Sequence, residues 1–331
     1  MSTTDYSIAV KGPEGLAQAH ALAVACYGKR AEPPEWWEWQ YFGPGAGDSK
    51  LVVATHGGDV VGMQPVTVRS FRRGDQRLTG AVFTGGMVHP GHRRRGLFTL
   101  LIRAAEQEAQ RLGASAAVTM PNDASYPAFK KVGWDDLGER EVHLRATFLG
   151  VPKRTDQTPV ALEEVPAFGP ETVECDERSG SSRSAIGVAR DAGWLAWRYR
   201  DNELYRYHRW QARDRSARLV GVLALSVMRV KGVSIGLLLD VLAGDHAVRA
   251  ALLAAALRFL RAARVPALIS VMSTAAVRRA LGGLGFVRVP ARVMPRGFHT
   301  MARALGSSPA NQALPQRLDG WLFTLGDWDG V

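Results

Sequence analysis

The sequence predicts an α+β fold used twice, as two tandem domains that each have a mixed, mostly antiparallel sheet flanked by helices. The chain has 331 residues, of which 46% are hydrophobic, and this length exceeds what one hydrophobic core usually serves. Aromatic and glycine landmarks of the first half recur in the second half. In both halves, runs typical of strands precede a long run with helical spacing.

The internal repeat rests on three pairs of segments. Segments 36–41 and 194–199 share three aromatic positions, 61–63 pairs with 220–222, and the glycine-containing segment 129–134 pairs with 281–286. The three pairs occur in the same order at nearly constant offsets, which favours duplication over chance clustering of aromatic residues.

Each half has the same expected order of elements. A helix ends at the aromatic segment, strands follow, and then come a long helix, a short buried strand, a short helix ending at a glycine, and a last strand. The expected strands are 50–54, 59–70, 77–89 and 116–120, then 206–212, 218–230, 233–242 and 267–272; the long helices are 95–112 and 246–263.

The expected domains follow from this pattern and from composition. A stretch over 152–184 is rich in Pro, Thr, Glu, Gly and Ser and indicates a connection. We expect a first domain over 1–150, a second over 151–306, and a tail over 307–331 that packs on the domains.

Composition excludes several classes of protein. No uncharged apolar run approaches the length of a membrane span, so no membrane partner is expected. Two cysteines, Cys26 and Cys175, cannot form a disulfide framework or a closed zinc site. No secretory signal is recognised, so a cytoplasmic location is expected. Because the two cysteines cannot build a closed site, no metal is expected. The formal charge of +11 favours an anionic ligand, but no nucleic-acid-binding motif supports a nucleic-acid partner.

The segment that carries chemistry is a basic loop between a strand and the long helix. The strand is expected to end at Pro90, and the loop enters the helix at Gly96. The first amides of a helix lack intrahelical partners and carry positive partial charge, so phosphate is the expected ligand. A solvated cluster formed by Arg93, Arg94 and Arg95 is the alternative. The pattern is neither a Walker loop nor a dinucleotide fingerprint.

These residues resemble a known family. Segments 88–90 and 93–97 resemble motif A of the GNAT superfamily of N-acyltransferases, Asn122 resembles the start of its motif B, and 129–134 resembles its Tyr-Glu/Lys-Lys/Arg-x-Gly-Phe segment. The resemblance covers about 52–142, and together with the repeat it implies a tandem GNAT architecture.

The resemblance implies acetyl-CoA or another acyl-CoA as co-substrate. It implies that the backbone of Met87 and Val88 binds the pantetheine arm, that Asn122 orients this arm, and that the basic loop cradles the diphosphate. The implied cofactor-binding residues are Met87, Val88, Arg93, Arg94, Arg95, Gly96, Leu97, Phe98, Thr99, Asn122 and Phe129. Phe98 is a departure, because the family has Gly or Ala there.

The catalytic groups are less clear from the sequence. Phe129 stands where the family often has the tyrosine that protonates the leaving thiolate, and Tyr126, one helical turn earlier, is expected to replace it. The glutamate that many members place before motif A is missing, and Asp327 is the expected base. Asp240, Asp329 and His89 remain alternatives, and packing or solvated surface is the structural alternative for each.

Acceptor binding is assigned to the first aromatic segment. The aromatic side chains expected to line a cleft between the halves are Trp36, Trp37, Trp39 and Tyr41. For Trp36 and Trp39 core packing is the favoured alternative, because both recur in the second half. The second half has no Arg-x-x-Gly motif, and Asp245 at the matching turn would repel phosphate. We therefore expect no CoA in the second domain.

The expected function is that of an N-acyltransferase. It moves an acetyl or longer acyl group from acyl-CoA to a primary amine of a small molecule, such as an amino sugar or an antibiotic-like compound. The alternatives are a noncatalytic acyl-CoA-binding regulatory module and a protein or peptide N-acetyltransferase.

Overall fold

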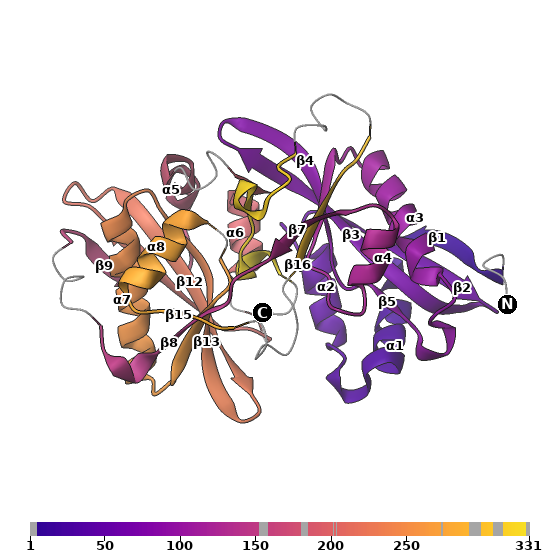
Figure 1. The fold of residues 1–331 in the computed structure, drawn as a ribbon, viewed down its shortest axis with the longest axis horizontal. Helices are drawn as coiled ribbons and strands as arrows, with labels where there is room; N and C mark the ends of the chain where they lie inside the picture. Colours follow the sequence, from indigo (N-terminus) through magenta and orange to yellow (C-terminus); the bar gives the residue numbers. More distant parts are fainter. Residues whose placement is uncertain are drawn as a thin grey trace. The chain divides into compact units, whose positions relative to one another are not determined.

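The fold is taken from a computed structural model that describes residues 5–151, 158–179, 185–200, 202, 204–272, 274–290, 299–306 and 314–328 (Figure 1). The chain forms two compact units. The first comprises Met1–Phe71, Arg77–Glu139 and Arg296–Gln316, and the second comprises Arg72–Gln76, Arg140–Pro295 and Arg317–Val331.

The strands of the first unit have the order β1-β2-β3-β4-β6-β16-β7, with the short strand β5 against β3. In this unit, the pairs β1–β2, β2–β3, β3–β5, β6–β16 and β7–β16 are antiparallel, and β4–β6 is parallel. Its elements are β1 (Ser7–Lys11), α1 (Leu16–Tyr27), α2 (Pro34–Phe42), β2 (Asp48–His56), β3 (Asp59–Arg73), β4 (Gln76–Phe83), β5 (Met87–Val88), α3 (Leu97–Arg111), β6 (Ala116–Thr119), α4 (Tyr126–Lys131), β7 (Asp135–Glu139) and β16 (His299–Ala304).

Side chains of β2 are buried on both faces of this sheet. Val52 and Ala54 belong to one core cluster with Leu101 of α3 and Phe129 of α4. Leu51 is fully buried as well, and its side chain faces Gly15 at the start of α1. Successive side chains of a strand point to opposite faces, so α3 and α4 cover one face and α1 packs on the other.

The second unit repeats this topology. Its sheet has the order β15-β8-β14-β13-β12-β11-β9, and β13–β14 is its single parallel pair. Its elements are β8 (His143–Ala146), β9 (Ala161–Glu164), α5 (Glu171–Ser179), β10 (Ile186–Val188), α6 (Ala192–Arg198), β11 (Tyr207–Arg213), β12 (Leu219–Val230), β13 (Val233–Ala243), α7 (His246–Ala262), β14 (Ala267–Ser270), α8 (Ala275–Gly283), β15 (Val287–Arg288) and β17 (Trp321–Leu322), which pairs with β10.

Each sheet contains a strand from the other half of the chain. β16 follows the second half in sequence but lies between β6 and β7 of the first unit, as the colours in Figure 1 show. β8 follows β7 directly but lies between β14 and β15 of the second unit. The units are therefore not contiguous in sequence, unlike the expected division into 1–150, 151–306 and 307–331.

The two expected long helices are present as α3 and α7. The expected strand over 77–89 is wrong as a single element, because it is divided into β4 and β5 by residues 84–86. Gly85 in this break has a φ of +67°, which an extended strand cannot accommodate.

Candidate acyl-CoA site

The break between β4 and β5 opens the sheet of the first unit. The parallel pairing of β4 with β6 ends at Phe83 and Thr119. The chain then shifts toward β3, where Met87 pairs with Met63 and Val88 pairs with Gly62. The backbone groups after Phe83 and Thr119 no longer pair with each other, and this divergence of residues 84–88 from the segment that follows β6 is called the wedge below.

The backbone of Val88 faces this wedge. The amide of the next residue, His89, donates to the Val61 carbonyl, 2.9 Å away, and alternate residues of an antiparallel strand direct their backbone groups to opposite sides. The Val88 carbonyl accepts from Nε of Arg93 at 3.1 Å. Its N–H has no acceptor among the residues that the structure describes, and it is available to a pantetheine amide, as the resemblance implies.

The loop after β5 leaves the N-terminus of α3 open. Arg94 and the N-cap Gly96 have φ values of +61° and +76°, and the N-cap supplies no side-chain hydrogen bond. Within the described residues, the amides of Leu97, Phe98 and Thr99 have no acceptor. A left-handed N-cap without a side-chain oxygen leaves these donors to an anion.

The three arginines of the loop differ in their environment. Arg93 and Arg94 are exposed, and their charges are available to a phosphate. Arg95 is half-buried, and its Nη1 lies 3.5 Å from the Tyr6 hydroxyl, which in turn lies 3.1 Å from Nδ1 of His92. The positive charge is therefore placed around the open helix end, as the predicted diphosphate cradle requires.

Phe98 packs directly against the wedge. A Cβ at Gly86 would lie 2.8 Å from the Phe98 ring, and this ring makes an edge contact with Phe129 at a centroid distance of 5.9 Å. The bulky Phe98 in the first turn of α3 is accommodated because a glycine occupies the facing position in the break between β4 and β5. The glycine at position 86 is the feature of the sequence that indicates room for a bulky residue at position 98.

Asn122 and Phe129 have structural contacts in this unit. Oδ1 of Asn122 accepts from the amides of Ala124 and Ser125 at 3.1 and 3.0 Å, so it organises the turn that enters α4. The Phe129 side chain is 2% exposed and packs on Trp134. Their predicted contacts with the cofactor stay predictions.

Tyr126 lies over the far strands of the sheet. Its hydroxyl donates to Oδ2 of Asp136 on β7 at 2.6 Å, and its ring lies 4.4 Å from that of His299 on β16. In the sheet order, β16 and β7 follow β6 on the side away from the wedge, and adjacent strands are about 4.8 Å apart. This geometry gives no support to Tyr126 as the acid at the wedge.

The cluster around Tyr126 is charged. The hydrogen bond to Asp136, with partial desolvation, raises the pKa of Tyr126. Burial opposes ionisation of Asp136, but the bonds from Tyr126 and the Gly138 amide outweigh it and lower the pKa of this carboxyl. His299 also lies 3.2 Å from Glu139. This cluster was not predicted from the sequence, because His299 reaches it only through the exchanged strand β16.

The aromatic residues of α2 form a buried group. Trp36 and Trp37 are each 3% exposed and Tyr41 is 0% exposed, and Trp37 stacks on Tyr41 at a centroid distance of 5.7 Å. Tyr41 reaches the strand break, since its hydroxyl lies 3.5 Å from that of Thr84 and against Gly85. Core packing describes Trp36 and Trp37, and their role in acceptor binding stays a prediction.

Asp327 belongs to a buried ion cluster of the second unit. Its Oδ1 and Oδ2 accept from Arg190 at 2.7 and 2.9 Å, and its side chain has no exposure. Arg190 also binds Asp240, which accepts from the Tyr199 hydroxyl at 2.7 Å. Because both oxygens of Asp327 are held by a cation, this geometry gives no support to Asp327 as a base. Asp329 lies outside the described residues.

The matching helix end of the second unit is closed. Asp245 is the N-cap of α7, and its carboxylate accepts from the amides of Ala247 and Val248 at 2.6 and 3.3 Å. In this unit a side chain of the chain itself occupies the place where α3 leaves free amides. That the second unit binds no CoA stays a prediction.

Neither a metal centre nor a membrane-spanning helix is found in the described part of the chain. Among those residues, no group of three or more His, Cys, Asp and Glu side chains has an arrangement that would hold a metal ion. No helix within them has the length and apolar character needed to span a membrane.

Comparison with solved structures identifies the fold. A GCN5-related N-acetyltransferase from Anabaena variabilis has a TM-score of 0.70 at 15% identity, covering 94% of this chain and 75% of its own. A probable N-acyltransferase from Enterococcus faecalis has a TM-score of 0.68 at 14% identity, covering 91% and 72%. A tandem GNAT protein of the clavulanic acid biosynthesis pathway has a TM-score of 0.60 at 15% identity, covering 92% and 99%.

The chain thus has the fold of tandem GNAT proteins. Residues 12–136 match the acetyltransferase (GNAT) domain family, whose members transfer acyl groups from acyl-CoA, and this segment of the first unit is therefore a GNAT domain. No curated protein sequence matches the chain.

Proposed function

We propose that the chain is an N-acyltransferase whose first unit binds acyl-CoA and transfers the acyl group to a primary amine of a small molecule. The observation that carries the proposal is the open N-terminus of α3 beside the wedge between β4 and β6. It presents free amides and two exposed arginines next to a strand break with unpaired backbone groups.

The reaction requires few groups from the protein. A neutral amine attacks the thioester carbonyl, a carbon–nitrogen bond forms and negative charge develops on the carbonyl oxygen. The carbon–sulfur bond then breaks, and the proton lost by the amine nitrogen balances the proton taken up by the released CoA thiolate. In this proposal the Val88 N–H supports the bound donor, and placement of the two substrates supplies much of the rate. The hydroxyl pair of Tyr41 and Thr84 lies beside Gly85 at the wedge.

A noncatalytic acyl-CoA-binding module is the second candidate. Two observations favour it: Phe129 is a buried core residue, and the Tyr126 hydroxyl is bound to Asp136 rather than free. The described residues therefore show no acid of the expected kind at the wedge. A protein or peptide amine is the alternative acceptor for the catalytic proposal.

Release of free thiol from acyl-CoA separates these candidates. The assay combines acetyl-, butyryl- and octanoyl-CoA with glucosamine, an aminoglycoside and a lysine-containing peptide, and CoA affinity is measured by calorimetry. Amine-dependent thiol release supports the transferase, and the acceptor that supports it gives the substrate class. CoA binding without turnover on any amine favours the binding module.

A pair of glycine variants tests whether CoA binds at the open N-terminus of α3. Gly96→Val strains the left-handed N-cap and brings a side chain to the open amides, so CoA affinity falls at least tenfold. Gly113→Val is the matched control: Gly113 follows the other end of α3, has a φ of +86°, and a Cβ added there would meet no atom within 4 Å. Equal loss of CoA binding in both variants would contradict the site.

A further inference from the structure

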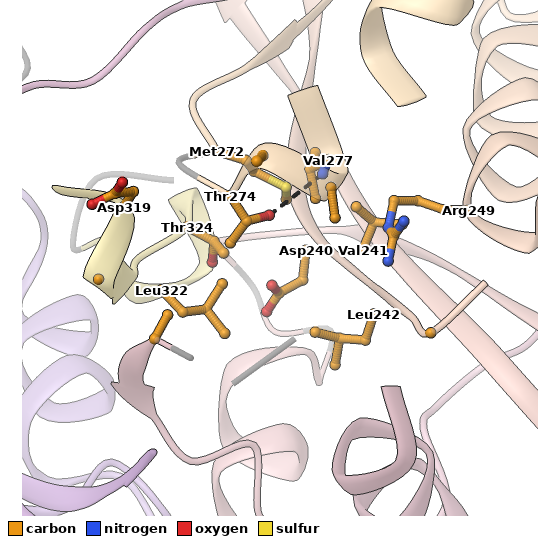
Figure 2. A pocket seen from close by; sticks show the side chains of 15 residues that line it. Asp240, Val241, Leu242, Arg249, Met272, Thr274, Val277, Asp319, Leu322 and Thr324 are labelled. Atoms are coloured by element: carbon orange, nitrogen blue, oxygen red, sulfur yellow. Dashed lines mark hydrogen bonds between the residues drawn. The ribbon is translucent and has the colours of Figure 1, made fainter. Parts of the chain in front are cut away.

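The second unit contains a cavity at the position of its own strand divergence (Figure 2). The parallel pairing of β13 with β14 ends at Leu238 and Ser270. A cavity of about 590 Å³ is formed beyond this point by Asp240, Val241 and Leu242 of β13, by the start of α8, and by residues of α7 and the C-terminal segment. This volume is in the range of small-molecule sites.

Each charged residue of the cavity wall has an ion-pair partner among the described residues, except Arg249. Asp240 is bound by Arg190 and Tyr199, and Asp319 lies 3.8 Å from Arg317 at the surface. Arg249 is 5% exposed, and no carboxylate of the described residues lies within salt-bridge distance of it. Its Nη2 donates to the Ala243 carbonyl, whereas its Nε has no partner within the described part of the chain.

A second source of positive potential lies on the cavity wall. The first turn of α8, Ala275–Val277, lines the cavity, and the N-cap Thr274 accepts only from Val277, at 3.4 Å. The amides of Ala275 and Ala276 have no acceptor among the residues that the structure describes. A buried guanidinium and an uncapped part of a helix N-terminus both favour an anion.

The other residues of the cavity wall indicate which kind of anion would fit. Ala185, Val241, Leu242, Met272 and Leu322 give an apolar surface, which suits a short hydrocarbon chain. The Asp245 carboxylate already holds the first amides of α7, so a diphosphate has no cradle here. A compact singly charged group with an apolar chain fits both features.

We infer that the cavity of the second unit binds a small organic carboxylate, with its carboxylate on Arg249 and the first amides of α8, and its short apolar chain against Val241, Leu242 and Met272. This site is separate from the acyl-CoA site of the first unit and does not rest on the proposed function.

Calorimetry on the full chain tests the inference, with acetate, butyrate and octanoate as probes and butylamine as the probe of opposite charge. The wild type binds at least one of the carboxylates saturably and does not bind butylamine. Arg249→Gln weakens carboxylate binding at least tenfold, and Arg249→Lys retains part of it. Arg261→Gln, an exposed position at the far end of α7, leaves it unchanged.

A second variant tests the same cavity without a substitution at the buried Arg249. Ala276 is exposed at the cavity wall, and Ala276→Trp fills the opening without changing the partners of Arg249, so it weakens binding at least tenfold. Absence of saturable binding by all three carboxylates in the wild type overturns the inference. Wild-type affinity in both Arg249→Gln and Ala276→Trp overturns it equally.

Discussion

At the scale of single residues, two glycines shape the wedge of the first unit. A side chain at Gly85 would overlap the Tyr41 hydroxyl, and one at Gly86 would overlap the Gln64 side chain and the Phe98 ring. The tyrosine, the glutamine and the phenylalanine therefore occupy space that only glycine leaves free. Packing of these three side chains against the two glycines therefore fixes the break between β4 and β5.

Gly85→Ala tests this packing. We expect a loss of about 2–4 kcal/mol in the free energy of unfolding, from the strain of the positive φ and from overlap with Tyr41. Adding Tyr41→Phe removes the overlapping oxygen and recovers part of the loss. Gly113→Ala, which has strain but no overlap, costs about 1–2 kcal/mol. Urea unfolding measures all four proteins, and equal losses for Gly85→Ala and Gly113→Ala would contradict the packing.

A buried aspartate of the second unit predicts a pH dependence. Burial, opposed by the nearby Arg72, raises the pKa of Asp176 from 3.8 to about 6. Between these values the folded chain keeps a proton that the unfolded chain has lost. The free energy of unfolding therefore falls as the pH rises through this window, by about 1–3 kcal/mol.

Asp176→Asn isolates this contribution, because asparagine does not titrate. The difference in unfolding free energy, wild type minus variant, is expected to decrease from pH 4 to pH 6.5 and then to level off, as measured by urea unfolding at each pH. A difference that rises over the same window would show that Arg72 dominates and that the pKa is lowered instead.

At the scale of elements, the exchanged strand β16 completes the first unit. Met301 is fully buried in the core with α3 and α4, and Nε of Arg303 lies 3.2 Å from Glu106. Glu106 also accepts from the Trp134 indole at 2.6 Å. The strand thus contributes both apolar packing and an ion pair to the face that carries α3.

A chain ending at residue 150 lacks this strand. We expect it not to unfold cooperatively, because β6 and β7 lose the strand between them and their core becomes exposed. Joining residues 296–306 to residues 1–139 through a flexible linker should restore a cooperative transition. Thermal unfolding followed by circular dichroism measures both, and a sharp transition in the chain of residues 1–150 alone would contradict the role of β16.

The sequence predicted the local elements better than the pairing between them. The helical spacing of Leu97 and Leu101, and the loop that ends at Gly96, are local patterns, and both α3 and its open N-terminus were predicted from them. The cluster of Tyr126, Asp136 and His299 depends on contacts across more than 160 positions, which no local pattern encodes. The surroundings of Asp327 were not predicted for the same reason, since its partner Arg190 is far from it in sequence.

At the scale of the whole molecule, two copies of one topology have diverged at one helix end. In each unit a long helix connects the two strands of a parallel pair, α3 between β4 and β6 and α7 between β13 and β14. However, α3 begins at an uncapped glycine and α7 begins at a capping aspartate. Part of the net positive charge of +11 lies where Arg93 and Arg94 flank the open end of α3. The difference between the two helix ends is the basis for assigning acyl-CoA to the first unit alone.

The number of CoA molecules bound per chain tests this assignment most directly, by native mass spectrometry and calorimetry on the full chain. We expect one CoA per chain, lost in Gly96→Val and unchanged in Asp245→Ala. Two CoA molecules per chain, or one that survives Gly96→Val with wild-type affinity, would contradict the assignment.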